Sequence, residues 1–315
     1  MEKRIKPSIL EANIIYLILA IGLLFIGSYV QSREIYSGLL ITEYILILLP
    51  ILLYLKLRRY SLKKVLRLNK ISFRQIIIVI IITVFTYPIA VFVQTIFINI
   101  ITSFKDVVPT EVPIPDNGPQ YLVSIFIIAI SPGICEEVMF RGLMLDAYES
   151  IGRKKSIMIS AILFAIFHFT FLNLLGPFIL GIVFGIMVYQ TNSIYSSIIG
   201  HIVNNSLALT IGYYINKYQY LIDDMIDQQM VSSNGSNSMM SSLFILGILV
   251  LSLLIVITLL KKLSEDDFYE DEREELYMRR ESYIKKRPVL DKLQYIPILI
   301  VTVLFIIINL ALILF

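Results

Sequence analysis

The sequence predicts an all-α fold, a polytopic bundle of about nine transmembrane helices, and three observations support that prediction. Hydrophobic residues make up 57% of the chain. Charged residues make up only 16% of it, against about 25% in soluble proteins. The mean hydropathy is +0.80, and the apolar residues gather into runs close to the ~20 residues that a helix needs to cross a bilayer.

Each apolar run predicts one membrane-spanning helix, and the fifth and sixth runs are the shortest. Asn173, Gly176 and Pro177 mark the break between those two. Basic residues precede the first run, but no cleavage-site pattern follows it, so it predicts a retained span and not a removed signal peptide. The predicted spans lie at about residues 9–30, 36–55, 76–104, 121–149, 156–172, 174–190, 193–216, 242–260 and 294–315.

Lysine and arginine are distributed unevenly between the loops, and this predicts the orientation. The loop at residues 56–74 is the most basic, and residues 153–155 and 261–292 also carry several lysines and arginines. The alternate loops carry few basic residues. We therefore expect an integral membrane protein with its N-terminus in the cytoplasm and its C-terminus outside.

Two polar segments interrupt the apolar pattern. Residues 217–241 end in a Ser- and Asn-rich stretch and predict a flexible linker on the outer face. Residues 263–292 run from an acidic block into a basic one, which predicts a solvated cytoplasmic helix with ion pairs. We expect N-terminal helices over residues 1–120, a core with the polar motifs over 121–216 and a C-terminal part over 217–315.

Ionisable side chains inside the apolar runs are the candidates for function. Each costs roughly 2.5–3.5 kcal/mol on insertion scales, so a chain rarely carries several of them without a use. The two histidines, His168 and His201, both lie in such runs, as do Glu136, Glu137 and Arg141. This grouping predicts an active site inside the membrane.

Helical spacing assigns different tasks to the adjacent acids. Glu137 and Arg141 are four residues apart and share a helix face, so they can form an ion pair. Glu136 is rotated by about 100° from its neighbour and is left for acid–base chemistry. His201 and Asn205 also share a face. Asn204 points elsewhere, and we expect it to serve packing.

Depth gives a separate test of this constellation. We count ~1.5 Å per helical residue from the predicted cytoplasmic loops. Glu136, His168 and His201 then lie roughly 20, 18 and 12 Å deep. We expect them to meet in one cavity on the cytoplasmic side of the bilayer midplane.

Three motifs together resemble those of the CPBP family of intramembrane endopeptidases, which includes the CAAX prenyl endopeptidases and the Abi proteins. They read Glu-Glu-x-x-x-Arg-Gly from Glu136, Phe-x-x-x-His ending at His168, and His-x-x-x-Asn from His201. The resemblance covers about residues 121–210, and no motif position departs from the pattern. It implies an all-helical peptidase of membrane-associated proteins or peptides.

The resemblance also implies roles for single residues. Glu136 and His168 match the pair that activates the attacking water, and His201 and Asn205 match the pair that stabilises the oxyanion. The supporting pair of the family corresponds to Glu137 and Arg141. The residues by themselves agree with this scheme, because peptide hydrolysis needs an activated water and a hydrogen-bond donor for the developing oxyanion.

A metal-dependent version uses the same residues. Glu136, His168 and His201 are a ligand set that catalytic zinc accepts, with the fourth position left for water. The His-Glu-x-x-His spacing that would settle the choice is absent from the sequence. We favour metal-free chemistry by Glu136 and keep Zn²⁺ as the alternative cofactor.

Several other residues have a structural interpretation. Cys135 faces a different direction from its acidic neighbours, and we expect it to be a packing residue; a single cysteine also excludes an intramolecular disulfide. The small-residue pair Gly181 and Gly185 predicts close helix packing. Pro88 and Pro132 predict kinks, the second of which opens space near the acidic pair.

Two other functions compete with the peptidase. A proton-coupled transporter would use the buried acids and histidines as a relay, but it predicts paired broken helices in an internal repeat, which the sequence lacks. A non-proteolytic scaffold or regulator would be expected to have lost a motif residue. The expected partners are the bilayer and a membrane-anchored peptide or protein, and no nucleic acid. Peptide maturation or bacteriocin self-immunity is favoured over CAAX processing as the task.

Overall fold

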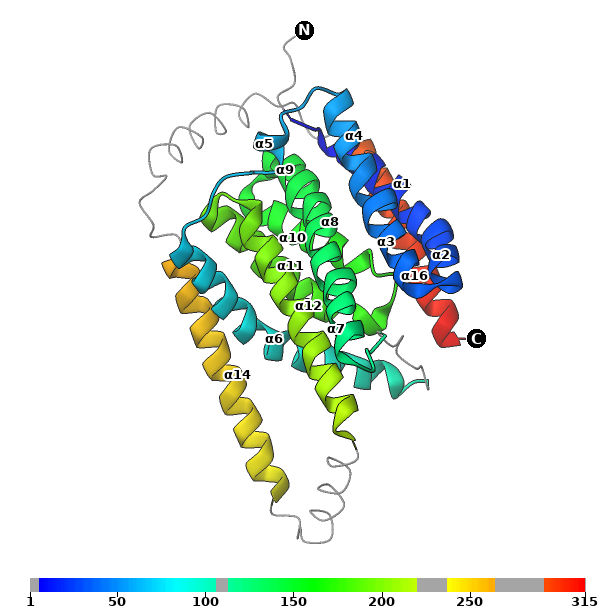
Figure 1. Ribbon diagram of the computed structural model, residues 1–315. Helices are drawn as coiled ribbons and strands as arrows, with labels where there is room; N and C mark the ends of the chain where they lie inside the picture. Colours follow the sequence, from blue (N-terminus) through cyan, green and yellow to red (C-terminus); the bar gives the residue numbers. More distant parts are fainter. Residues whose placement is uncertain (1–5, 106–112, 220–236, 264–291, 315) are drawn as a thin grey trace.

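All regular elements in the part of the chain that the structure describes are helices (Figure 1). The structure is a computed structural model. The predicted all-α membrane fold is confirmed. Most of the predicted polar segments, 217–241 and 263–292, lie outside the described residues. The described residues are 6–105, 113–219, 237–263 and 292–314.

The first two spans form a hairpin in which each helix widens into a π-helix. The first span starts at Ser8, which forms a capping box with Glu11. The second starts at Glu34, whose carboxylate accepts hydrogen bonds from the backbone N–H groups of Tyr36 and Ser37. The π-helices η1 and η2 contact each other. The elements in order are α1 (Ile9–Gly22), η1 (Leu23–Gly27), α2 (Ser28–Arg33), α3 (Ile35–Leu40), η2 (Ile41–Leu48) and α4 (Leu49–Leu57).

A second capping box starts the third span. Ser72 caps this helix together with Gln75, and the helix continues through Pro88 as one element. It packs against α11, α12 and α14. The elements are α5 (Leu62–Val65), α6 (Phe73–Thr102), α11 (Leu175–Thr191), α12 (Ile194–Lys217) and α14 (Asn237–Lys262).

The fourth span is the longest and carries the acidic pair. It runs as one helix over Gly118–Ile151. The N–H of Ser131 bonds the carbonyl of Phe126, five residues back, where Pro132 has no N–H to donate. Two π-helices flank the short α-helix of the acids, one before it and one after it. The elements are α7 (Gly118–Ser124), η3 (Ile125–Ile130), α8 (Ser131–Glu137), η4 (Val138–Met144), α9 (Leu145–Tyr148) and η5 (Glu149–Ile151).

The predicted close packing of the glycine pair is confirmed. A Cβ on Gly181 would lie 2.9 Å from the Cα of Ala161, and one on Gly185 would lie 3.2 Å from Ile157. Both contacts are with α10 (Arg153–Ile166). The glycines thus let α10 and α11 approach more closely than larger residues would allow.

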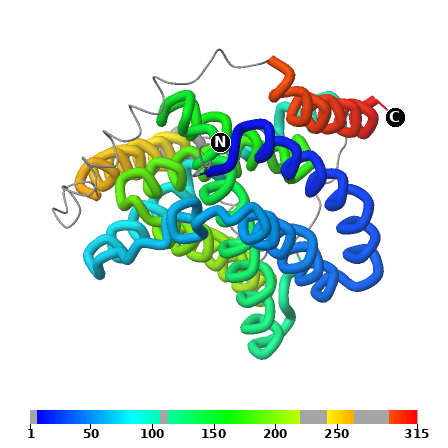
Figure 2. Tube along the Cα trace, turned by 90° about the horizontal axis from the view of Figure 1, so that it is seen from above, coloured from blue at the N-terminus to red at the C-terminus, as the bar shows by residue number. Residues whose placement is uncertain are grey.

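The last two helices lie on opposite sides of the bundle (Figures 1 and 2). α14 packs mainly on α6, whereas α16 (Ile296–Leu314), after η8 (Lys292–Tyr295), packs along α1. Most of the described apolar side chains of α14 are exposed, as expected for a helix that faces lipid.

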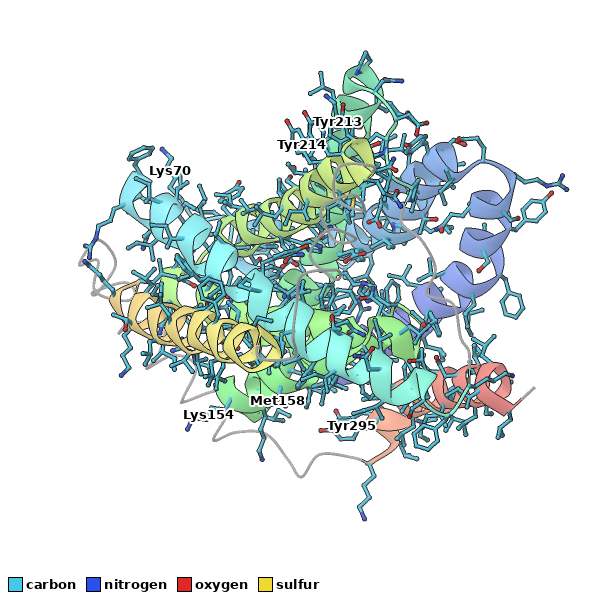
Figure 3. The ribbon with its side chains drawn as sticks, turned by 90° about the horizontal axis from the view of Figure 1, so that it is seen from below. Lys70, Lys154, Met158, Tyr213, Tyr214 and Tyr295 are labelled. Atoms are coloured by element: carbon cyan, nitrogen blue, oxygen red, sulfur yellow. The ribbon has the colours of Figure 1, made fainter. Side chains whose placement is uncertain are left out.

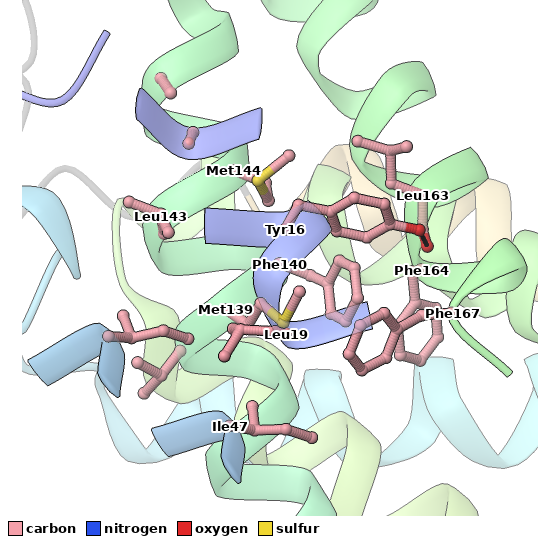
Figure 4. Packing of buried hydrophobic residues seen from close by; sticks show 14 of the residues in the cluster. Tyr16, Leu19, Ile47, Met139, Phe140, Leu143, Met144, Leu163, Phe164 and Phe167 are labelled. Atoms are coloured by element: carbon pink, nitrogen blue, oxygen red, sulfur yellow. Dashed lines mark hydrogen bonds between the residues drawn. The ribbon is translucent and has the colours of Figure 1, made fainter. Parts of the chain in front are cut away.

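The core between the first hairpin and the fourth span is aromatic (Figure 4). Tyr16, Phe140 and Phe167 pack with ring centroids 5.5–6.4 Å apart. The Tyr16 hydroxyl donates to the carbonyl of Leu163 over 2.9 Å, so a buried polar atom ties α1 to α10. This core joins the N-terminal helices to the segment with the acids.

The count of nine spans is not confirmed. Seven helices in the described residues are long and apolar enough to cross a membrane. The fifth predicted span, 156–172, is not one helix, because α10 has 14 residues and ends at Ile166. At 1.5 Å per residue it covers about 21 Å of the ~30 Å hydrocarbon core. The seventh, α12, is long enough, but its Ser, His and Asn side chains make it more polar.

The loops predicted to be cytoplasmic gather at one end of the bundle. Lys6 donates to the carbonyl of Asp146 over 3.1 Å. Arg67 forms a buried ion pair with Glu149 at 3.0 Å. The side-chain amide of Asn69 donates to the carbonyl of Asn192 over 2.7 Å. Four segments that are far apart in sequence therefore share this end.

Tyrosines mark the other end, where α12 terminates (Figure 3). Tyr213 and Tyr214 pack edge to face, and Tyr214 stacks on Tyr218. The ammonium group of Lys217 lies 5.8 Å from the Tyr213 ring centroid. Tyrosine and lysine at a helix end are typical of a membrane–water interface in a chain without tryptophan.

Candidate active site

A glycine sets the distance between α8 and α12. A Cβ on Gly133 would lie 2.6 Å from the side chain of Ile202 and 3.2 Å from its backbone nitrogen. Only glycine permits this approach without a shift of one helix. The contact brings the acidic pair of α8 next to the histidine that precedes Ile202.

Glu137 is the centre of a buried network. Its Oε1 accepts hydrogen bonds from Arg141 Nη1 over 2.7 Å and from His201 Nδ1 over 2.9 Å. The predicted ion pair of Glu137 with Arg141 is confirmed, and its side chains are fully buried. The guanidinium also lies between the rings of Phe164 and Phe184, 4.4 and 5.4 Å from their centroids. Sequence spacing did not predict the contact with His201.

Glu136 points away from this pair, as predicted, into a cavity of about 260 Å³. A water molecule takes about 30 Å³ of liquid volume, so the cavity has room for several waters or for part of a peptide. His201 Nε2 lies 3.9 Å from Glu136 Oε2. The cavity is lined by Leu23, Leu24, Ser28, Gln31, Leu39, Thr42, Glu43, Ile47, Glu136, Phe167, His168 and Phe169.

His168 lies in a turn after α10 and not inside a helix, which corrects the predicted fifth span. α10 ends at Ile166, and Phe169, with a φ of 55°, lies after it in this turn. Nδ1 of His168 donates to the carbonyl of Phe164 over 3.0 Å, which leaves Nε2 as the acceptor. Non-helical backbone at membrane depth is tolerated where it is buried in protein or lines a cavity, and this turn does the latter.

Two amide side chains hold this turn and the residues after it. Asn309 of α16 accepts from the N–H of Phe171 over 2.6 Å and donates to the carbonyl of Phe169 over 3.2 Å. Gln94 of α6 donates to the carbonyl of Leu172 over 2.7 Å. Backbone groups that no helix satisfies thus find partners from two distant spans.

Asn205 is engaged in a different contact from the one its motif predicts. Its side-chain amide donates to the carbonyl of Ile128 over 3.1 Å, four residues before Pro132. Since proline has no N–H, Asn205 supplies a hydrogen bond that the helix lacks. Asn204 donates to the Asn205 Oδ1 over 3.0 Å, in line with its predicted packing role.

The structure therefore brings only some of the predicted site residues to the cavity. Glu136 and His168 line the cavity, whereas His201 and Asn205 do not belong to its described lining. His201 lies behind Glu136, between the two acids. Cys135 is buried and free, consistent with packing.

Sequence reasoning missed Glu43, in η2 of the second span. It is 6% exposed and lines the same cavity as Glu136 and His168. The signal was available, because an acid in the middle of an apolar run is as costly here as in the fourth span. No neighbouring motif drew attention to it.

The donor set does not fit a metal ion. Among the described residues, no three His, Cys, Asp or Glu side chains come together as a metal-binding group. In particular, the predicted set of Glu136, His168 and His201 is split between the cavity and the network behind it.

Comparison with protein families identifies the middle of the chain. Residues 118–207 match the family model described as type II CAAX prenyl endopeptidase Rce1-like. These residues are similar to that family, and we refer to them as the Rce1-like segment. The predicted resemblance to the CPBP family is thereby confirmed. No curated protein and no solved structure matches the chain.

The Rce1-like segment includes all six predicted site residues, from Glu136 to Asn205. The family model is described as that of a CAAX prenyl endopeptidase, and the described residues include seven helices long and apolar enough to cross a membrane. Glu43 and Asn309 lie outside the Rce1-like segment, so part of the cavity wall and the support of the His168 turn come from elsewhere in the chain.

Proposed function

We propose that the chain is an intramembrane endopeptidase that hydrolyses peptide bonds of membrane-associated proteins or peptides with a water activated by Glu136 and His168. One observation carries this proposal: Glu136, from α8, and His168, from the turn after α10, line the same cavity. The Rce1-like match supports the reaction class.

The proposed water lies between Glu136 and His168. His168 Nε2 is the ring nitrogen left as an acceptor, so it can hold one hydrogen of the water. Glu136 takes the other proton as the water attacks the scissile carbonyl, and it delivers that proton to the leaving amine. Protons balance, since the acid ends the cycle as it began.

His201 and Asn205 are proposed to stabilise the oxyanion. Because His201 Nδ1 donates to Glu137, a second donor at Nε2 requires the imidazolium form. Asn205 uses one amide hydrogen on Ile128 and keeps a second one for the oxyanion. Glu137 and Arg141 support His201 from behind.

The proposed chemistry needs no metal ion, and no step is assigned to one. The proposed orientation places the basic end of the bundle in the cytoplasm of a bacterial cell, with the N-terminus inside and the C-terminus outside. A membrane-anchored peptide or protein is the proposed substrate, and peptide maturation or bacteriocin self-immunity is favoured over CAAX processing.

The test uses the full-length protein in liposomes with two substrates, a prenylated peptide with a CAAX tail and an unprenylated apolar membrane peptide. Products are identified by mass spectrometry. We expect Glu136→Gln and His168→Ala to lower kcat by about 10²–10⁴, the usual contribution of acid–base catalysis. Cys135→Ala, the adjacent buried residue, is the matched control and should cleave like the wild type.

Cleavage by Glu136→Gln at the wild-type rate would disprove the proposed mechanism. A chelator should leave cleavage unchanged, and purified protein should hold no stoichiometric zinc. Loss of cleavage on chelation, with recovery on added Zn²⁺, would instead establish the metal-dependent version. The substrate that is cleaved decides between a CAAX tail and another membrane peptide.

A further inference from the structure

Within the described part of the chain, Glu43 has no partner that explains its burial. It lies in the middle of the second span and is 6% exposed. Its Oε2 is out of contact with solvent and has no hydrogen-bond partner in the described part of the chain. A buried polar atom without a partner costs free energy, so a purely structural role does not account for it.

Neighbouring polar groups of the hairpin do have partners. Thr42 Oγ1 donates to the carbonyl of Gly38 over 2.8 Å and accepts from Gln31 Nε2 over 2.9 Å. Tyr44 accepts from the hydroxyl of Ser131 over 3.3 Å, which fixes η2 against α8. Gln31 and Thr42 also line the cavity, but of these residues only Glu43 has a buried side-chain atom without a partner in the described part of the chain.

The cavity has a distinctive chemistry. Two carboxyl groups, Glu43 and Glu136, face it, and its described lining contains no lysine or arginine. Of the other lining residues, six are leucine, isoleucine or phenylalanine, and four are polar: Ser28, Gln31, Thr42 and His168. Such a cavity suits a ligand with an apolar surface and N–H donors, which is the chemistry of a hydrophobic peptide segment.

We propose that Glu43 binds the substrate: its carboxyl group accepts a hydrogen bond from a backbone N–H of an apolar peptide in the cavity. This inference rests on the proposed function, since the peptide is the substrate whose scissile carbonyl is attacked by the water that Glu136 and His168 activate. Glu43 sits in a π-helix, an element often found at functional sites.

The test compares Glu43→Leu with Glu43→Gln in the full-length protein. Leucine removes the acceptor, and we expect KM to rise about tenfold, as for one lost hydrogen bond, with kcat little changed. Glutamine keeps an acceptor and should restore KM. Tyr54→Phe, a buried hydroxyl of the same span outside the cavity lining, is the matched control and should leave KM unchanged.

Thermal unfolding shows whether the Glu43→Leu variant still folds. Leucine replaces an unpartnered buried carboxyl, so Glu43→Leu should unfold at a higher temperature than the wild type while it binds more weakly. A lower unfolding temperature would mean that Glu43 is structural and would overturn the proposal. Unchanged KM in Glu43→Leu, or an equal loss of kcat in both variants, would also overturn it.

A binding assay separates this inference from the proposed function. A fluorescent apolar peptide with an uncleavable bond is titrated into the wild type and both Glu43 variants. Weaker binding to Glu43→Leu, without cleavage of any peptide by the wild type, would support the binding role and overturn the peptidase. Cleavage of a substrate by the wild type, with equal binding of the uncleavable peptide by the wild type and both variants, would support the peptidase and overturn the binding role of Glu43.

Discussion

At the scale of single residues, Arg141 is the largest fully buried side chain in the described part of the chain. Its charge is balanced by Glu137 and covered by two aromatic rings. We predict that Arg141→Met destabilises the fold by about 3–5 kcal/mol, because it leaves a buried carboxylate without its cation. Thermal unfolding in detergent measures the effect.

A double-mutant cycle provides the control. Glu137→Gln in the Arg141→Met background removes the orphaned charge, so the double variant should be more stable than Arg141→Met alone. Additive effects of the two substitutions would contradict the coupling. This pair is also what the sequence predicts best, because a spacing of four residues on a helix fixes which side chains meet.

At the scale of elements, the turn that carries His168 depends on α16. Asn309 satisfies the N–H of Phe171 and the carbonyl of Phe169, and it also donates to the carbonyl of Phe305 in its own helix. We predict that Asn309→Leu lowers kcat of cleavage at least tenfold through a displaced His168, at a cost of about 1–3 kcal/mol for the unpaired groups.

The control for that prediction is Asn309→Asp, which keeps the acceptor for the Phe171 N–H and should retain more activity than leucine. Equal activity of Asn309→Leu and the wild type would contradict a positioning role. A pH–rate profile adds a readout, because a displaced His168 changes the profile, whereas a uniformly destabilised protein only loses amplitude.

These contacts also mark the limit of sequence reasoning at this scale. Apolar runs predicted the helices, because length and hydropathy are local properties. They did not predict that α10 ends at Ile166, since the residues after it are apolar but are held as a turn by Asn309 and Gln94 from distant spans. Glu43 was not predicted for a related reason: its role depends on the cavity that it lines together with residues distant in sequence.

At the scale of the whole molecule, the ion pairs and hydrogen bonds of Lys6, Arg67 and Asn69 draw the basic loops to one end. For Arg67, burial lowers the pKa, but Glu149, Tyr189 and Asp146 outweigh it and hold the pKa above its usual value. Arg67 therefore stays positively charged, and its contacts hold the loop over the ends of α9 and α11. The tyrosine cluster of α12 lies at the other end, which agrees with the positive-inside orientation.

Orientation and span count can be tested together, since the only cysteine is buried and Cys135→Ala gives a background without thiols. Lys154→Cys, Tyr195→Cys and Lys217→Cys each place one thiol at an exposed position. We predict that an impermeant maleimide labels the third in intact cells, and the first two only after the cells are opened. The reverse pattern would contradict the orientation. Labelling at position 195 but not at 154 in intact cells would mean that α10 does not cross the membrane, because two crossings return the chain to the same face and one does not.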